Sequence, residues 1–321
     1  VEDYIEKDFH KQEGYSDYEG AKFSYLFKRQ RELHFGSRLQ NHALNHRMNE
    51  EFKKFFPTCE YTPIIRVPAT NRYWFNDNLL KIKANKKYFN IAESIIEIID
   101  SYVEAKRGSF EKFIETCEKL REIDEENAPR TSEFVLGLLA PNIDARIFEI
   151  VSFSILKYYY SDQTVYFGFE LNEIEEENLK LFKTGRTNAN DGGIDFVMKP
   201  LGRFFQVTET TDVKKYFLDI DKLEKFPITF VVKSEETSET LLQKIRFNAE
   251  KQYSIKAVVN KYIDCIEEII NIQELTERFK KAVELGYLDD ILNEIIIQSK
   301  VEFNYNEDNE DEDEDADDDN S

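Results

Sequence analysis

Apolar residues recur three or four positions apart over much of the chain, which is the spacing that places them on one face of a helix. This spacing predicts helices over residues 21–56, 89–107, 109–122, 143–160 and most of 238–298. The stretch 143–160 is apolar over most of its circumference. We therefore expect that helix to be buried, because no polar face is left for solvent.

Short runs rich in β-branched and aromatic residues predict strands over 164–171, 194–198, 203–210 and 228–233. The second and third runs are joined by Lys-Pro-Leu-Gly, which predicts a hairpin. Residues 172–193 are polar and end in Asn-Asp-Gly-Gly, which predicts a turn. The order of elements predicts an α/β fold in which a mixed-sheet core carries helical N- and C-terminal additions.

Composition narrows the class of protein. The 321 residues are 41% hydrophobic and 14% aromatic, which excludes a chain that is disordered throughout. No apolar run approaches the roughly 20 residues of a membrane-spanning helix, and the charged first ten residues do not resemble a signal peptide. The three cysteines lie far apart without a CxxC pair, which predicts reduced thiols and a cytoplasmic protein.

Charge is distributed unevenly. Eleven acids and no base lie between residues 307 and 319, and without them the net charge of −21 becomes −10. Such a block repels itself and has almost nothing to bury, so we expect residues 306–321 to be disordered. The block either competes weakly for a nucleic-acid-binding face or serves only solubility.

A basic segment lies near the N-terminus. Residues 21–90 hold 14 Lys or Arg against 5 Asp or Glu, whereas residues 91–180 hold 20 acids against 9 bases. Concentrated positive charge with interleaved aromatic and amide side chains is typical of a phosphate-binding face, although a solvated surface is the alternative. The candidates for contacts with DNA are Arg66, Asn71, Arg72, Asn76, Lys81, Lys83 and Arg186.

The candidate chemistry lies between residues 146 and 209. Phe148-Glu149 lies in the buried helix, Asp191-Gly192-Gly193-Ile194-Asp195 opens a strand, and Gln206-Val207-Thr208 lies on the next strand. Hydrolysis of a phosphodiester needs one or two hard cations held by oxygen ligands, and Mg²⁺ prefers a few carboxylates. A hairpin that presents an acid on one strand and further oxygen ligands across from it could hold such a cation.

This stretch resembles the catalytic core of the PD-(D/E)XK nuclease superfamily, and within it the Mrr-like branch of restriction endonucleases. The resemblance implies that Glu149, Asp195 and Gln206 bind Mg²⁺. It also implies a restriction-endonuclease-like core. In that family a Lys two residues after the Gln or Glu orients or activates the attacking water, and Thr208 stands at that position.

The missing lysine leaves four alternatives. Thr208 could hold the water itself, a lysine could come from elsewhere, a bulge could bring Glu209 into the site, or catalysis could be lost. Strand alternation directs Glu209 away from Gln206 and Thr208. The candidate lysines are Lys183, Lys214 and Lys215, and we favour Lys183, then Lys214, because they flank the two strands.

Together these features predict a Mg²⁺-dependent, sequence-specific double-stranded DNA endonuclease of the type II restriction enzyme kind. A palindromic site would be matched by a homodimer, for which helices 89–104 and 262–297 offer surface. The alternatives are a catalytically silent DNA-binding protein, a repair or recombination nuclease of the same superfamily, and an interaction protein whose acidic tail mimics DNA. The predicted organisation is a largely helical basic DNA-binding region (1–130), a nuclease core (141–235), a helical part packed on that core (236–305) and the acidic tail (306–321).

Overall fold

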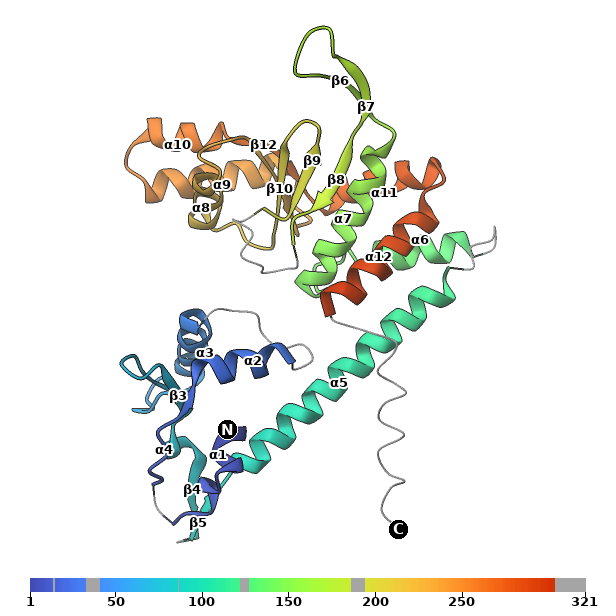
Figure 1. The fold of residues 1–321 in the computed structure, drawn as a ribbon. Coiled ribbons are helices and arrows are strands. Elements are labelled where there is room, and N and C mark those ends of the chain that lie inside the picture. Colours follow the sequence, from blue (N-terminus) through green and yellow to red (C-terminus); the bar gives the residue numbers. More distant parts are fainter. Residues whose placement is uncertain (14, 33–40, 86, 122–126, 186–193, 304–321) are drawn as a thin grey trace. The chain divides into compact units, whose positions relative to one another are not determined.

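A computed structural model describes residues 1–13, 15–32, 41–85, 87–121, 127–185 and 194–303. The chain forms two compact units, Val1–Phe113 and Ile114–Ser321, and each is described by itself (Figure 1). In the described part of the chain, no helix is both long and apolar enough to cross a membrane.

The first unit combines helices with two small antiparallel sheets. One sheet has three strands in the order β1-β3-β2, and the other pairs β4 with β5. The strands are β1 (Ala21–Lys22), β2 (Ile64–Val67), β3 (Arg72–Phe75), β4 (Lys81–Ala84) and β5 (Lys87–Asn90). The helices are α1 (Glu2–Glu6), η1 (Phe9–Lys11), α2 (Phe23–Glu32), α3 (Asn41–Phe55), α4 (Asp77–Leu80) and α5 (Ala92–Lys119), the last of which runs on into the second unit.

The second unit is built on a five-stranded mixed sheet in the order β12-β11-β10-β9-β8. The strands β8, β9 and β10 form an antiparallel meander, whereas β10, β11 and β12 run parallel. Their bounds are β8 (Lys180–Lys183), β9 (Phe196–Lys199), β10 (Arg203–Thr208), β11 (Ile228–Val232) and β12 (Ile266–Ile270).

Helices cover both faces of this sheet (Figure 1). One layer contains α7 (Ala145–Ser161), α11 (Ile272–Glu284) and α12 (Leu288–Phe303), with α6 (Ala128–Gly137) beside α12. The other contains α8 (Val213–Lys222), α9 (Ser238–Gln252) and α10 (Lys256–Ile263). Helix α7 packs against β8 of the sheet and against the helices α11 and α12, which explains why its sequence is apolar over most of its circumference.

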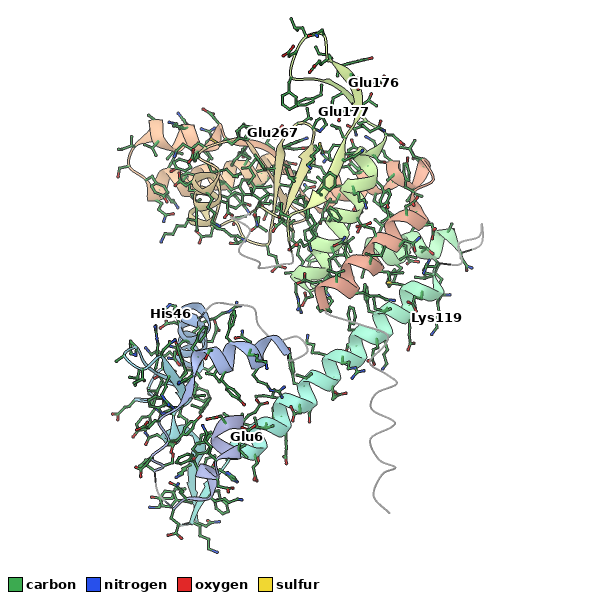
Figure 2. All side chains as sticks on the ribbon, viewed as in Figure 1. Glu6, His46, Lys119, Glu176, Glu177 and Glu267 are labelled. Carbon is green, nitrogen blue, oxygen red and sulfur yellow. The ribbon has the colours of Figure 1, made fainter. Side chains whose placement is uncertain are left out.

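A two-stranded hairpin, β6 (Thr164–Phe167) with β7 (Glu175–Asn178), protrudes from the second unit (Figure 1). Gly168 fits the tight start of its loop, because a Cβ there would lie 2.5 Å from the carbonyl oxygen of Glu173. Glu176 and Glu177 lie on β7, as Figure 2 shows, and the pattern of burial along β7 is exposed throughout.

The structure confirms the α/β class and most predicted elements of the second unit, and it differs in three places. The region 1–130 contains five short strands in addition to its helices. The polar stretch 172–193 contains β7 and β8, and β8 rather than β6 is the first strand of the main sheet. The part 236–305 is not wholly helical, because it supplies β12 to the sheet.

Candidate metal centre and catalytic site

Glu149 lies on α7 and is 5% exposed. Its Oε1 lies 2.9 Å from Nζ of Lys183, the last residue of β8, and both side chains are less than a tenth exposed. A carboxylate buried in an apolar helix face requires such a cation, because the desolvation of an unpaired charge is costly. The structure thereby joins Glu149 to the first of the candidate lysines.

Asp195 lies directly before β9 and is held by the strands on both sides. Its backbone N–H donates to the carbonyl oxygen of Phe205 over 2.9 Å, and its own carbonyl accepts from the N–H of Thr184 over 2.9 Å. Its Oδ2 accepts from the backbone N–H of Val207 over 2.6 Å. Asp195 is therefore fixed in the sheet by backbone bonds, and its carboxylate also contacts β10.

Gln206 and Thr208 lie near the end of β10, and both are buried. The Gln206 Nε2 donates to the carbonyl oxygen of Val207 over 3.2 Å, while its Oε1 is buried and has no hydrogen-bond partner among the described residues. An amide oxygen left without a partner in a buried place requires an explanation, such as a bound ion.

Thr208 has a lysine beside it, although not the first or second candidate. The Nζ of Lys215 on α8 donates to Thr208 Oγ1 over 3.3 Å. Lys214, which the sequence favours over Lys215, is exposed, and its backbone N–H donates to Oδ1 of Asp212, the N-cap of α8. Lys215 is therefore the lysine of α8 that contacts the predicted motif.

Glu209 lies on the face of the sheet opposite to Gln206 and Thr208, as strand alternation predicts. Its Oε1 lies 2.6 Å from Nζ of Lys233, and its side chain is half exposed. The pairing of β10 with β11 is regular from Phe204 to Thr208. The alternative in which a bulge brings Glu209 into the site is therefore wrong.

Register assigns Lys183 to the face of the sheet under α7. It lies opposite Phe196, which in turn lies opposite Phe205, and directly opposite residues share a face. The ring of Phe196 lies 5.2 Å from that of Phe153, and the ring of Phe205 lies 6.3 Å from that of Tyr160, both on α7. Glu149 reaches Lys183 from this helix.

Register assigns Gln206 and Thr208 to the opposite face. They lie opposite Phe230 and Val232 of β11, which belong to the hydrophobic core beneath α8 and α9. The predicted ligands therefore do not come from one face. Glu149 approaches from the α7 side and Gln206 from the α8 side.

What the predicted residues share is one end of the sheet. The end of β8, the start of β9 and the end of β10 are adjacent because the three strands are antiparallel. Lys183, Asp195 and Thr208 lie at these three positions. In the described residues no group of three or more His, Cys, Asp or Glu side chains could hold a metal ion. The predicted set contains two carboxylates and an amide.

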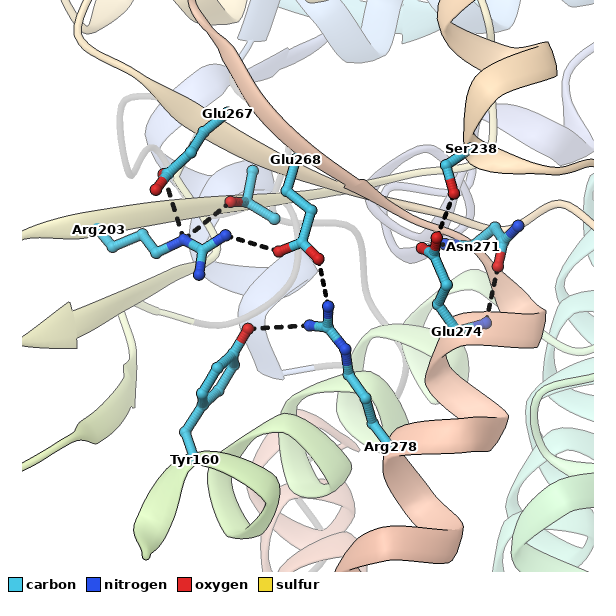
Figure 3. Close-up of polar contacts among 9 residues, drawn as sticks. Tyr160, Arg203, Ser238, Glu267, Glu268, Asn271, Glu274 and Arg278 are labelled. Carbon is cyan, nitrogen blue, oxygen red and sulfur yellow. Dashed lines mark hydrogen bonds and ion pairs between the residues drawn. The ribbon is translucent and has the colours of Figure 1, made fainter. Parts of the chain in front are cut away.

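A charged network that no sequence pattern predicts lies at the other end of the sheet (Figure 3). Arg203 at the start of β10 donates to Thr229 Oγ1 over 3.1 Å and to Glu268 Oε2 over 2.6 Å. Arg278 on α11 also pairs with Glu268 and donates to the hydroxyl of Tyr160 over 2.9 Å. Burial raises the pKa of that tyrosine. The network ties β10, β12, α7 and α11 together.

The residues of the first unit that are predicted to contact DNA lie on strands β2 to β4, in the turn between β2 and β3, and at the N-cap of α4. Arg66 and Arg72 lie on strands β2 and β3. The guanidinium of Arg66 lies 5.6 Å from the ring centre of Tyr73, and that of Arg72 donates to the carbonyl oxygen of Gly20 over 2.6 Å. Asn71 lies in the turn between β2 and β3 with a φ of 51° and is exposed.

Asn76 has a structural role. It is 7% exposed, accepts from the backbone N–H of Asn78 as the N-cap of α4, and donates to the carbonyl oxygen of Thr62 over 3.1 Å. Its amide is therefore engaged within the fold and cannot read a base without breaking these bonds. Lys81 donates to the carbonyl oxygen of Gln12 over 3.3 Å, and Lys83 is exposed. Arg186 lies outside the described residues.

No family model, no curated protein and no solved structure matches this chain.

Proposed function

We propose that the chain is a Mg²⁺-dependent, sequence-specific double-stranded DNA endonuclease of the PD-(D/E)XK superfamily, similar to type II restriction enzymes of the Mrr-like branch and acting as a homodimer. The observation that carries the proposal is the arrangement at one end of the sheet. There Glu149 and Lys183 form a buried ion pair, and Lys183 lies opposite Phe196, the residue that follows Asp195. The order of α7 followed by the meander β8-β9-β10 is the order that the resemblance implies.

Oxygen ligands for Mg²⁺ are present in this arrangement. Asp195 and Gln206 offer a carboxylate and an amide oxygen, and the unpartnered buried Oε1 of Gln206 fits a cation ligand. Glu149 would complete the set from α7. When bound, the metal would supply positive charge to the phosphate and lower the pKa of a bound water.

Lys183 takes the role of the missing motif lysine in this proposal. Its ammonium is held in place by Glu149, so the lysine cannot adopt the many rotamers of an exposed lysine. A cation fixed in advance can orient a water and stabilise negative charge that develops on the phosphate without a further cost of reorganisation.

DNA binding in the proposal falls to the first unit, where the basic segment lies. Arg66, Asn71, Arg72, Lys81 and Lys83 form the proposed contact set. Phosphate contacts by such cations are weakened by salt, because the counterions that they displace from DNA gain less entropy when the bulk salt concentration is high. Binding that weakens steeply with salt would therefore support this assignment.

The test is cleavage of plasmid DNA with and without Mg²⁺, comparing the wild type with Asp195→Asn. This variant keeps a side-chain oxygen that can accept from the N–H of Val207, so the fold is expected to persist while cleavage is lost. The matched control is Asp264→Asn, an exposed position at the end of α10. Discrete fragments from the wild type and the control, with none from Asp195→Asn, are the expected result.

Two other results would reject the proposal. Cleavage by Asp195→Asn near the wild-type rate would reject the site, and the absence of DNA binding by any variant would reject the function. Cuts restricted to branched junctions would instead indicate a repair or recombination nuclease.

A second candidate function is a catalytically silent DNA-binding protein, favoured by Thr208 at the motif position. Thr208 Oγ1 accepts from Lys215, so the hydroxyl that could hold a water has a protein partner. Binding of DNA with no cleavage across several divalent metals would support this function over the first.

A further inference from the structure

An apolar pocket of about 320 Å³ lies in the first unit, whereas the residues of the proposed nuclease site belong to the second unit. Its walls come from α2, α3, the sheet β1-β3-β2 and the start of α5 (elements in Figure 1). The apolar and aromatic residues that line it are Val1, Tyr18, Ala21, Phe23, Leu26, Met48, Ile64, Tyr73, Trp74, Phe75, Ile95 and Ile99. Only three strongly polar side chains, Asp3, Gln30 and Asn45, join them.

Two polar atoms of the lining are buried without a hydrogen-bond partner among the described residues. They are the hydroxyl of Tyr73 and Oδ1 of Asn45. Tyr73 is 6% exposed, and its ring is held between neighbours, 5.8 Å from the ring of Phe23 and 5.6 Å from the guanidinium of Arg66. A buried hydroxyl without a partner is costly, so it fits a site that a ligand completes.

Asp3, by contrast, is already engaged. It accepts from Nζ of Lys7 over 2.8 Å and from the hydroxyl of Tyr18 over 2.5 Å, and these bonds lower the pKa of its carboxyl against the opposing effect of burial. The charge in the wall of the pocket therefore has partners within the protein. An uncharged ligand suits such a pocket better than a cation does.

The volume of the pocket and the chemistry of its lining side chains indicate which kind of ligand fits. An engineered apolar cavity of about 150 Å³ holds benzene, so this pocket has room for about twice that volume, the size of a bicyclic ring with a substituent. Aromatic walls favour a flat ring by stacking. The amide oxygen of Asn45 requires a donor, and the hydroxyl of Tyr73 can donate or accept.

We propose that this pocket binds a flat, uncharged heteroaromatic ring with an N–H edge, which would donate to Asn45 and pair with the hydroxyl of Tyr73. Two sources carry this chemistry. One is a free small molecule, and the other is a base turned out of a DNA duplex bound by the same unit. The proposal goes beyond the nuclease function and does not require it, because binding of the free ring can be measured without cleavage.

The first arm of the test uses free adenine and the full chain. Trp74 is the only tryptophan of the chain and lines the pocket, so its fluorescence reports on the site directly. Adenine is expected to change the Trp74 emission along a saturable curve. Toluene, which has a ring without an N–H edge, is expected to compete poorly with adenine.

The matched variants are Tyr73→Phe and Tyr88→Phe. The first removes the unpartnered hydroxyl and the second removes a hydroxyl from a tyrosine that is 67% exposed. Tyr73→Phe is expected to weaken adenine binding about three- to tenfold without lowering the melting temperature of the free protein. Tyr88→Phe is expected to change neither the adenine affinity nor the melting temperature. Asn45→Leu, which removes the acceptor, is expected to weaken adenine binding by a similar factor.

The second arm adds a DNA duplex with a central mismatch, in which a base leaves the stack more easily. A change in Trp74 emission that free adenine reverses would identify the extruded base as the source. A response to free adenine alone would identify a free molecule. No saturable response to adenine or to the duplex would overturn the proposal, as would equal adenine affinity in Tyr73→Phe, Asn45→Leu and the wild type, or toluene binding as tightly as adenine.

Discussion

The ion pair between Lys183 and Glu149 is the most deeply buried pair of opposite charges at the proposed site. If one partner of a buried pair is removed, the other charge remains desolvated without compensation. We expect Lys183→Met to lower the free energy of unfolding by about 3 kcal/mol, measured by urea denaturation. The double variant Lys183→Met with Glu149→Leu should recover most of this loss. A double variant no more stable than the single one would show that the pair is not what stabilises the position.

Thr208 gives a second prediction, about rate. Because the Nζ of Lys215 already lies 3.3 Å from Thr208 Oγ1, a second ammonium introduced by Thr208→Lys would meet a like charge. We expect Thr208→Lys to leave the cleavage rate unchanged or to lower it. Lys183→Ala should lower that rate by about 100-fold or more, as the loss of a fixed cationic donor does. Time courses of DNA cleavage measure both. A faster Thr208→Lys enzyme together with an active Lys183→Ala enzyme would indicate a site that lacks its lysine.

The cysteines provide a prediction about pH. Burial raises the pKa of Cys117 to about 12, and burial also raises the pKa of Cys265. A raised pKa means that less thiolate is present at any pH below it, and the thiolate is the form that reacts. At pH 8 iodoacetamide should therefore modify Cys59, which is partly exposed, long before the other two. Peptide mass spectrometry measures the order, and early modification of Cys117 would contradict its burial.

At this scale the sequence predicted which elements carry the candidate residues, but not how those residues lie relative to one another. The sequence pattern placed Glu149, Asp195 and Gln206 on their elements, because a buried acid in an apolar helix and an acid at a strand start are local features. The faces from which they approach depend on register across three strands, which local patterns do not encode. The pairing of Lys183 with Glu149 joins residues 34 positions apart and could be named from sequence only as one candidate of three.

Among the elements, the hairpin β6–β7 differs most from the rest of the second unit. Its loop holds Phe169 and Leu171 at 93% and 92% exposure. Because these side chains bury almost nothing, Phe169→Ser and Leu171→Ser should change the free energy of unfolding by less than about 0.5 kcal/mol. Phe196→Ala in β9, where the ring is fully buried, should cost about 3–5 kcal/mol. Thermal denaturation compares the three variants, and a large loss from either hairpin variant would contradict the exposed position.

The sequence predicts an element correctly where that element is buried, because buried elements have apolar sequences. The strands β9, β10 and β11 and the helix α7 are apolar because both faces or the whole circumference are covered. In contrast, β7 has the sequence EEEN and β12 the sequence IEEII. The charges of β12 are explained by Glu268, which pairs with two arginines at the end of the sheet. Tertiary partners outweighed local propensity there.

At the scale of the whole molecule, charge is the feature that the sequence revealed most directly. The eleven acids of residues 307–319 lie in the same chain as a basic segment of net charge +9. Removal of residues 306–321 should tighten nonspecific DNA binding, most strongly at low salt, where like and unlike charges are least screened. Fluorescence anisotropy with a short labelled duplex measures this. Equal affinities of the full-length and truncated proteins at low salt would leave the tail with a role in solubility only.

Strand β11 has neighbours on both sides, and all five of its residues are buried. Amide protons in such a strand exchange with solvent only when the surrounding sheet comes apart as a whole. Their exchange rates into heavy water therefore measure the global stability of the second unit under native conditions, without denaturant. The amides of β6 and β7, by comparison, belong to a separate hairpin and can exchange through local opening. A single deuterium-exchange experiment thus separates the cost of opening the hairpin from the cost of unfolding the sheet.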